Sequence, residues 1–83
     1  MKVNIKYFAS IREALGQSSE TRDTQAKTVA ALRDQLLALS PVHAQALSRD
    51  KPVRIALDQT LCDESALLQE GCELAFFPPV TGG

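Results

Sequence analysis

The residues of this chain best placed to do chemistry are its last six, within the stretch FFPPVTGG. Two prolines cannot continue a sheet ladder and hold the backbone extended, and the two β-branched residues after them are stiff. Two glycines follow, and a catalytic tunnel that admits a main-chain carboxylate requires residues without a Cβ. A frayed, glycine-rich terminus is the alternative interpretation. We expect a functional tail formed by Pro78, Pro79, Val80, Thr81, Gly82 and Gly83.

The other reactive side chains form no catalytic group in the sequence. The lone His43 has no nucleophile to serve, and the adjacent carboxylates Asp63 and Glu64 point in different directions. The four glycines are scattered and make no phosphate-binding loop. Cys62 and Cys72 are too few for a zinc site, so we interpret them as thiols in a reducing compartment, with one disulfide as the alternative. We expect no active site, metal or bound cofactor of the chain's own.

Length and charge limit the class of protein. Eighty-three residues make one domain, and a formal net charge of −1 argues against binding to nucleic acid. No apolar run approaches the roughly 18 residues that a membrane span needs. The N-terminal stretch MKVNIKYFAS contains lysine and alternates like a strand, so it is a poor signal peptide. We therefore expect a cytoplasmic protein without membrane contact.

Alternating apolar residues predict strands near both ends of the chain. In KVNIKYF, residues 2–8, every second residue is apolar, and Phe8 falls on the opposite face. In CELAFF, residues 72–77, Phe77 likewise lies opposite Phe76. These two strands are the most apolar, which favours them as the central pair of a sheet.

A different spacing predicts the main helix. In TVAALRDQLLALSP, Thr28 can act as the N-cap and Pro41 ends the pattern. Its apolar residues recur at three- and four-residue steps, at Val29, Leu32, Leu36 and Leu39. Weaker patterns predict a helical turn closed by Gly16 at 9–16, a polar strand at 18–24, a helical turn within 41–50, a strand at 53–57 and a short strand after the turn at 58–60.

The order of these elements indicates an α+β fold in which one main helix packs across one mixed sheet. The ubiquitin-like β-grasp has this order, and a ferredoxin-like relative also fits the pattern. We expect a β-grasp domain at residues 1–77 and an extended tail at 78–83.

Two surface features suggest a protein partner. If the first and last strands are neighbours, Phe8 and Phe77 meet outside the main core, with Leu61 as a candidate third member. A small cluster beneath a loop is the alternative. Residues 58–73 also carry five acids and no base, which arises either by chance or from docking to a basic surface.

The stretches YFASIREALG and LAFFPPVTGG resemble the small subunit of molybdopterin synthase, a β-grasp sulfur carrier. TVAALRDQL and ALDQTL also match that family, so the resemblance covers most of the chain. It weakens around residues 40–52, and Cys72 stands where the family usually has an acidic residue.

The resemblance implies a mechanism in which partners supply the catalytic groups. A ubiquitin-activating-like adenylyltransferase would use ATP to adenylate Gly83, and a persulfide sulfur would convert it to a thiocarboxylate. The tail would then enter the large synthase subunit and give sulfur to a cyclic pyranopterin phosphate, within a heterotetramer. The resemblance assigns partner contacts to Phe8, Leu61, Phe77 and, more weakly, Arg12.

Two other functions remain open from the sequence. One is a sulfur carrier of another pathway, such as thiazole synthesis. The other is a ubiquitin-like protein modifier or interaction module, because activation by adenylation is common to both classes.

Overall fold

The computed structural model describes residues 1–79 of the chain. The helices and strands of that part are β1 Lys2–Tyr7, α1 Ala9–Leu15, β2 Ser19–Asp23, α2 Val29–Leu37, α3 Pro41–Ala46, β3 Arg54–Leu57, β4 Thr60–Cys62 and β5 Glu73–Phe77. Val80, Thr81, Gly82 and Gly83 lie outside the described residues.

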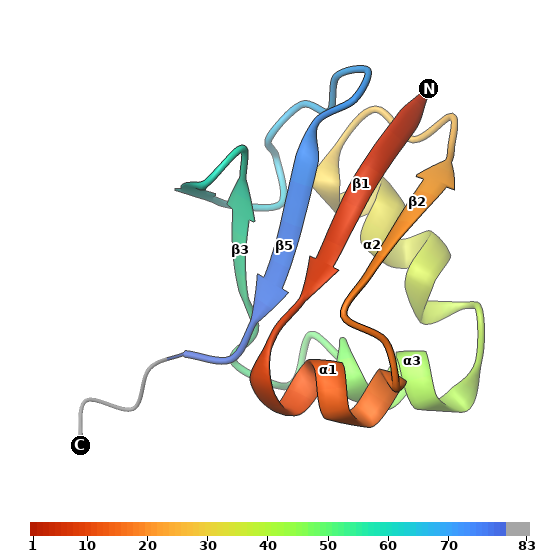
Figure 1. Cartoon of the computed structure of the whole chain (residues 1–83), viewed down its shortest axis with the longest axis vertical. Coiled ribbons are helices and arrows are strands. Elements are labelled where there is room, and N and C mark those ends of the chain that lie inside the picture. Colours follow the sequence, from red (N-terminus) through yellow and green to blue (C-terminus); the bar gives the residue numbers. More distant parts are fainter. Residues whose placement is uncertain (80–83) are drawn as a thin grey trace.

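The strands form one mixed sheet in the order β2-β1-β5-β3-β4 (Figure 1). β1 and β5 are parallel neighbours at its centre, with Ile5 beside Leu74, and the other strand pairs are antiparallel. The prediction that the first and last strands form the central pair is confirmed. This arrangement is the predicted α+β, ubiquitin-like β-grasp.

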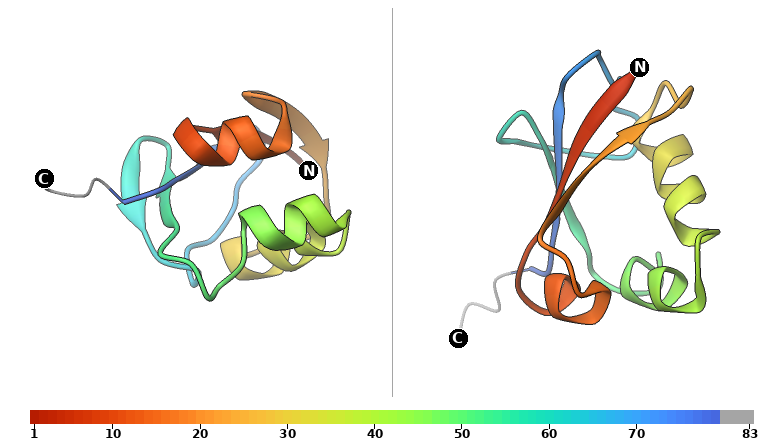
Figure 2. Two further views of the ribbon diagram at one scale, coloured as in Figure 1. Left: turned by 90° about the horizontal axis from the view of Figure 1, so that it is seen from below. Right: turned by 45° about the vertical axis from the view of Figure 1, so that its right-hand side comes forward.

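The helices leave one face of the sheet open. α2 lies across the other face, while α1 and α3 lie near the end at which β1 and β5 finish (Figure 2). The open face is therefore available for contacts outside the domain.

The core lies between the sheet and α2. Alternation in β1 places every second side chain in it, and the rings of Tyr7 and Phe76 stack with centroids 6.2 Å apart. Burial of each large apolar side chain contributes about 1.5–3 kcal/mol. The fully buried side chains are Val3, Ile5, Tyr7, Val29, Leu32, Leu36, Leu47, Leu74 and Phe76.

α2 begins as predicted and ends early. The Thr28 hydroxyl accepts a hydrogen bond from the Ala31 amide at 3.2 Å, which confirms the N-cap. The prediction that the helical repeat includes Leu39 and ends at Pro41 is wrong: α2 ends at Leu37, and Leu39 is exposed. Ser40 caps α3 instead, and Pro41 occupies its first turn.

Two tight turns shape the open face. Ala9 has φ of 51° where β1 passes into α1. At the other turn, Asp58 and Gln59 have φ of 50° and 68° and join β3 to β4. Left-handed residues in a two-residue loop match the twist of the strands they join.

Candidate functional site

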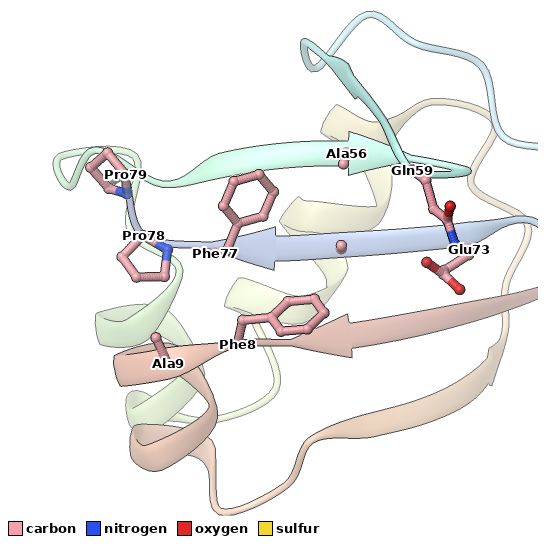
Figure 3. Close-up of a pocket in the computed structure, with 9 residues that line it drawn as sticks. Phe8, Ala9, Ala56, Gln59, Glu73, Phe77, Pro78 and Pro79 are labelled. Atoms are coloured by element: carbon pink, nitrogen blue, oxygen red, sulfur yellow. The ribbon is translucent and has the colours of Figure 1, made fainter. Parts of the chain in front are cut away.

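A hollow of about 580 Å³ lies on the open face of the sheet, where the chain leaves β5 (Figure 3). It is mostly apolar and combines residues from opposite ends of the sequence. Its lining consists of Phe8, Ala9, Ala56, Gln59, Glu73, Ala75, Phe77, Pro78 and Pro79. We call it the tail pocket.

The turn between β1 and α1 places Phe8 in the tail pocket. The Phe8 amide donates to the carbonyl of Phe76 at 3.2 Å, so the backbone still follows the sheet. Ala9 then turns the chain sharply, and Phe8 remains 44% exposed. Phe8 shares the pocket with Phe77 and the two prolines, and a contiguous apolar surface of this kind is typical of a binding site.

Strand parity places Phe77 on the same side. Phe76 is fully buried beneath the sheet, so Phe77 must point to the opposite face, where it is half-buried. Ala75 and Ala56 are partners across β5 and β3, and both line the tail pocket. Because they are small, the pocket stays open between the larger side chains. The prediction that Phe8 and Phe77 meet outside the main core is confirmed.

The opposite end of the tail pocket is polar. Gln59 and Glu73 lie there, away from Phe77 and the two prolines (Figure 3). One oxygen of Glu73, Oε1, is 3.3 Å from the Lys6 ammonium. The turn residue Asp58 fixes this end: its amide donates to the Glu73 carbonyl at 2.8 Å, and its Oδ1 accepts from the Glu73 amide at 2.9 Å.

The structure brings together four of the six predicted contact residues that it describes, namely Phe8, Phe77, Pro78 and Pro79. Leu61 is 58% exposed and pairs with Ala56 across β3 and β4, so it lies beside the tail pocket but does not line it. Arg12 is exposed on α1 and lines neither this pocket nor the next. The predicted reacting residues, Gly82 and Gly83, are outside the described part, as are Val80 and Thr81.

A second hollow, of about 250 Å³, adjoins the tail pocket. Both are lined by Pro78 and Pro79, and the second is otherwise bounded by α1, the end of α3 and the segment before β3. The two prolines therefore form a ridge with apolar surface on both sides.

Acidic residues of the segment 58–73 form hydrogen bonds within the domain. Asp58 holds Glu73 as described, and Asp63 accepts from Ser65. The Glu70 carboxylate accepts from the Lys2 amide at 3.2 Å. Hydrogen bonding to Ser65 holds the pKa of the exposed Asp63 carboxyl below its usual range. Most of this acidity is accordingly explained by local structure, whereas docking to a basic surface stays a prediction.

Arg33 is a buried charge that the sequence analysis missed. The residue is only 3% exposed, and its guanidinium group donates to the carbonyls of Leu47 (2.7 Å) and Ser48 (3.1 Å). Burial lowers the pKa of Arg33, and the nearby Glu64 opposes that effect. The spacing signals this position, because residue 33 follows Val29 by one helical turn. Arg33 therefore fastens α2 to the segment after α3.

His43 and the two cysteines are the remaining reactive side chains considered from the sequence. His43 Nδ1 lies 2.8 Å from the Ser40 hydroxyl at the start of α3, and Cys62 and Cys72 are both free. Burial raises the pKa of the Cys62 thiol. Residues 1–79 contain no group of three or more histidine, cysteine or acidic side chains that could hold a metal ion. No helix in that range is long and apolar enough to cross a membrane.

Fold and pocket together define a ubiquitin-like β-grasp protein with a mostly apolar pocket where the chain leaves its last strand. A family model described as the ThiS family matches residues 5–83. The molybdopterin synthase sulfur carrier subunit of Escherichia coli (strain K12) is 40% identical over 81 residues, covering 98% of this chain and 99% of the relative. The subunit of the same name from Haemophilus influenzae is 36% identical with the same coverage.

Solved structures share the fold. The small archaeal modifier protein 1 of Haloferax volcanii superposes with a TM-score of 0.73 at 25% identity, covering 95% of this chain and 98% of that one. A chain from the protein–protein complex of subunits 1 and 2 of molybdopterin-converting factor from Helicobacter pylori 26695 superposes with the same TM-score at 24% identity, and both chains are covered completely. The chain belongs to the ThiS family, and its curated relatives are sulfur carrier subunits.

Proposed function

We propose that this protein is the sulfur-carrying small subunit of molybdopterin synthase, and that the carboxylate of Gly83 is the group that carries the sulfur. The observation that carries the proposal is the tail pocket, which brings the exposed Phe8 and the half-buried Phe77 together beside the two prolines that begin the tail. The names of curated relatives, aligned over nearly the whole chain, support the same function.

The proposed chemistry begins with activation of a poor electrophile. An adenylyltransferase joins the Gly83 carboxylate to the AMP part of ATP and releases pyrophosphate. A persulfide sulfur then attacks the acyl carbon, and AMP leaves. Reduction of the resulting acyl disulfide by a thiol frees the thiocarboxylate. Two such carriers supply the two sulfurs that convert cyclic pyranopterin monophosphate to molybdopterin.

The domain itself contributes position rather than catalysis in this proposal. The tail pocket binds the large synthase subunit or the activating enzyme, and the two prolines after β5 cannot continue the ladder of the sheet. Gly82 and Gly83 fit a narrow active site because neither has a side chain. Catalytic lysines and arginines belong to the partners. Two free thiols, Cys62 and Cys72, support a reducing, cytoplasmic setting.

Intact mass spectrometry tests the carrier role. The protein is incubated with the activating enzyme, ATP and a persulfide donor, and we expect its mass to rise by the difference between sulfur and oxygen. Fragmentation should place the change at Gly83. A Gly83→Ala variant, which blocks a tunnel with one methyl group, serves as the control and should be thiolated poorly. Unchanged mass of the native chain under these conditions would reject the proposal.

A protein-modifier function is the second candidate, because the small archaeal modifier protein shares the fold at 25% identity. A modifier forms an isopeptide bond between its last glycine and a lysine of a target. Conjugates to lysine without any thiocarboxylate in the same incubation would favour this function. Conversion of cyclic pyranopterin monophosphate by the thiolated protein and the large subunit would favour the synthase and exclude a thiazole pathway as its main role.

A further inference from the structure

The second hollow, beside the tail pocket, is used by no step of the proposed function. It measures about 250 Å³, and we call it the α1 hollow. This volume is below the roughly 300–1,000 Å³ typical of small-molecule pockets, so a short peptide segment fits it better than a small-molecule ligand. Its lining consists of Ser10, Ile11, Ala14, Ala46, Lys51, Pro52, Val53, Pro78 and Pro79.

The α1 hollow has apolar walls and one charge. Ile11 and Ala46 are buried, and Val53 is half-buried. Among the described residues that line the hollow, Lys51 alone is charged. It is exposed and forms no ion pair within residues 1–79. A well-matched occupant therefore presents an apolar group to the walls and a negative charge to Lys51.

The residues that follow Pro79 have this character in the required order. Val80 comes directly after a residue of the lining, and its side chain is apolar. Residues 80–83 span at most about 14 Å when extended. That length is sufficient to cross a hollow of this volume and reach the lysine. In the proposed function, Gly83 ends in a carboxylate, which supplies the negative charge.

Charge favours the α1 hollow over the tail pocket for this segment. Among the described residues that line the tail pocket, Glu73 alone is charged, and its carboxylate repels another carboxylate. Lys6, 3.3 Å from Glu73, already offsets part of that charge. Lys51 attracts a carboxylate at the α1 hollow. The tail pocket then stays open while the α1 hollow is filled.

We propose that in the free protein the residues after Pro79 fold back over the α1 hollow, with Val80 against Val53 and the Gly83 carboxylate paired with Lys51. This inference rests on the proposed function, because it takes Gly83 as the end that reacts. One valine and one exposed ion pair make a contact that a partner can displace.

The contact is autoinhibitory, because a molecule whose tail is folded back does not present Gly83 to another protein. An activating enzyme then binds with an apparent Kd that exceeds the intrinsic value by the reciprocal of the open fraction. The activating enzyme or the large subunit can still bind the open tail pocket first and take up the tail when it is released.

NMR spectroscopy of the full chain tests the apolar contact. We expect nuclear Overhauser effects between the methyl groups of Val80 and Val53. Val80→Ser should shift the methyl signals of Ile11 and Val53, because an apolar group leaves them. Val42→Ser is the matched control: Val42 is an exposed valine outside the α1 hollow, and its loss should leave these signals in place. Absence of the Val80–Val53 effects, or unchanged signals in Val80→Ser, would overturn the proposal.

A second pair of variants tests the charged contact. Lys51→Met removes the charge at the α1 hollow, and Lys27→Met removes that of an exposed lysine outside it. We expect the amide signal of Gly83 to move in Lys51→Met only. The KM of the activating enzyme for Lys51→Met should also fall about twofold or more, because the open fraction rises. A Gly83 signal that ignores Lys51→Met would reject the ion pair, and an unchanged or higher KM would reject autoinhibition.

Intact mass of the native chain after incubation with the activating enzyme, ATP and a persulfide donor separates this inference from the proposed function. If Gly83 is thiolated and the NMR effects are missing, the carrier function stands and only the folded-back tail is lost. If the NMR effects are present and Gly83 is not thiolated, the contact stands while the carrier function and the autoinhibitory role are rejected.

Discussion

Phe76 and Phe77 are chemically identical neighbours, yet one is fully buried and the other faces the tail pocket. Successive strand side chains point to opposite faces, so the first packs in the core and the second lies on the open face of the sheet. In the proposed function, binding of a partner therefore depends on a residue that lies outside the main core.

We expect Phe77→Asp to abolish binding of the large subunit while the domain stays folded, because a carboxylate in the apolar part of the tail pocket meets an unfavourable, water-poor surface. Calorimetric titration measures the binding, and circular dichroism checks the fold. Leu67→Asp is the control: Leu67 is also exposed but lies outside the pocket. Equal affinity of Phe77→Asp and Leu67→Asp would contradict the proposed role of the tail pocket.

Arg33 shows the opposite case, a polar residue that the fold requires. Arg33→Met keeps most of the side-chain volume but leaves the carbonyls of Leu47 and Ser48 without their donors. We expect the free energy of unfolding to fall by about 2–4 kcal/mol. Urea titration measures the change. Arg49→Met, which removes an exposed arginine paired with Asp34 and Glu64, should cost no more than about 1 kcal/mol. Equal losses would show that burial of Arg33 is not the cause.

At the scale of elements, helix α2 depends on the residue before it. Thr28→Ala removes the acceptor for the Ala31 amide, so the free energy of unfolding should fall by about 1 kcal/mol. Thr28→Ser keeps the hydroxyl and should restore most of the loss. The midpoint of urea unfolding distinguishes the three proteins. An unchanged midpoint for Thr28→Ala would mean that water replaces the cap at no cost.

Element positions could be predicted from the sequence wherever periodicity decides them. The alternation in residues 2–8 and 72–77 was enough to place β1 and β5 together, and to bring Phe8 near Phe77. The prediction that helix α2 includes Leu39 was wrong because Ser40 and Pro41 start a new helix, α3, directly after it. The polar end of the tail pocket could not be predicted: the sequence indicates a turn at 58–60, but it does not show that this turn brings Gln59 to the same pocket as Glu73.

At the scale of the whole molecule, burial of a phenol ties stability to pH. Tyr7 is buried beside β2, and its hydroxyl has no hydrogen bond of good geometry in the described part of the chain. Desolvation first, then the negative charge of Glu20, raise the pKa of Tyr7 well above its usual range, while Arg22 acts in the opposite sense. The folded state therefore holds the phenolic proton more tightly than the unfolded state does.

This difference predicts the direction of alkaline destabilisation. The contribution of the protonated Tyr7 phenol to the stability of the fold is fully present below the unfolded pKa of about 10. It is lost as pH rises through the higher folded pKa. In Tyr7→Phe, the part of the fall in stability that begins above about pH 10 should disappear. This loss of stability is measured by comparing the urea midpoints of the native protein and of Tyr7→Phe at neutral and at alkaline pH. Parallel curves for the native and variant proteins would assign the alkaline loss to other groups.

The central position of β5 has a consequence for synthesis. β5 is the last strand made, yet it joins the β2-β1 pair to the β3-β4 pair, which do not otherwise touch within the sheet. A nascent chain that stops before residue 73 thus has two separate antiparallel strand pairs, β1 with β2 and β3 with β4, and no strand between them. The domain cannot complete its fold until β5 has emerged from the ribosome, so the tail pocket, which β5 helps to line, exists only in chains whose synthesis has passed that strand.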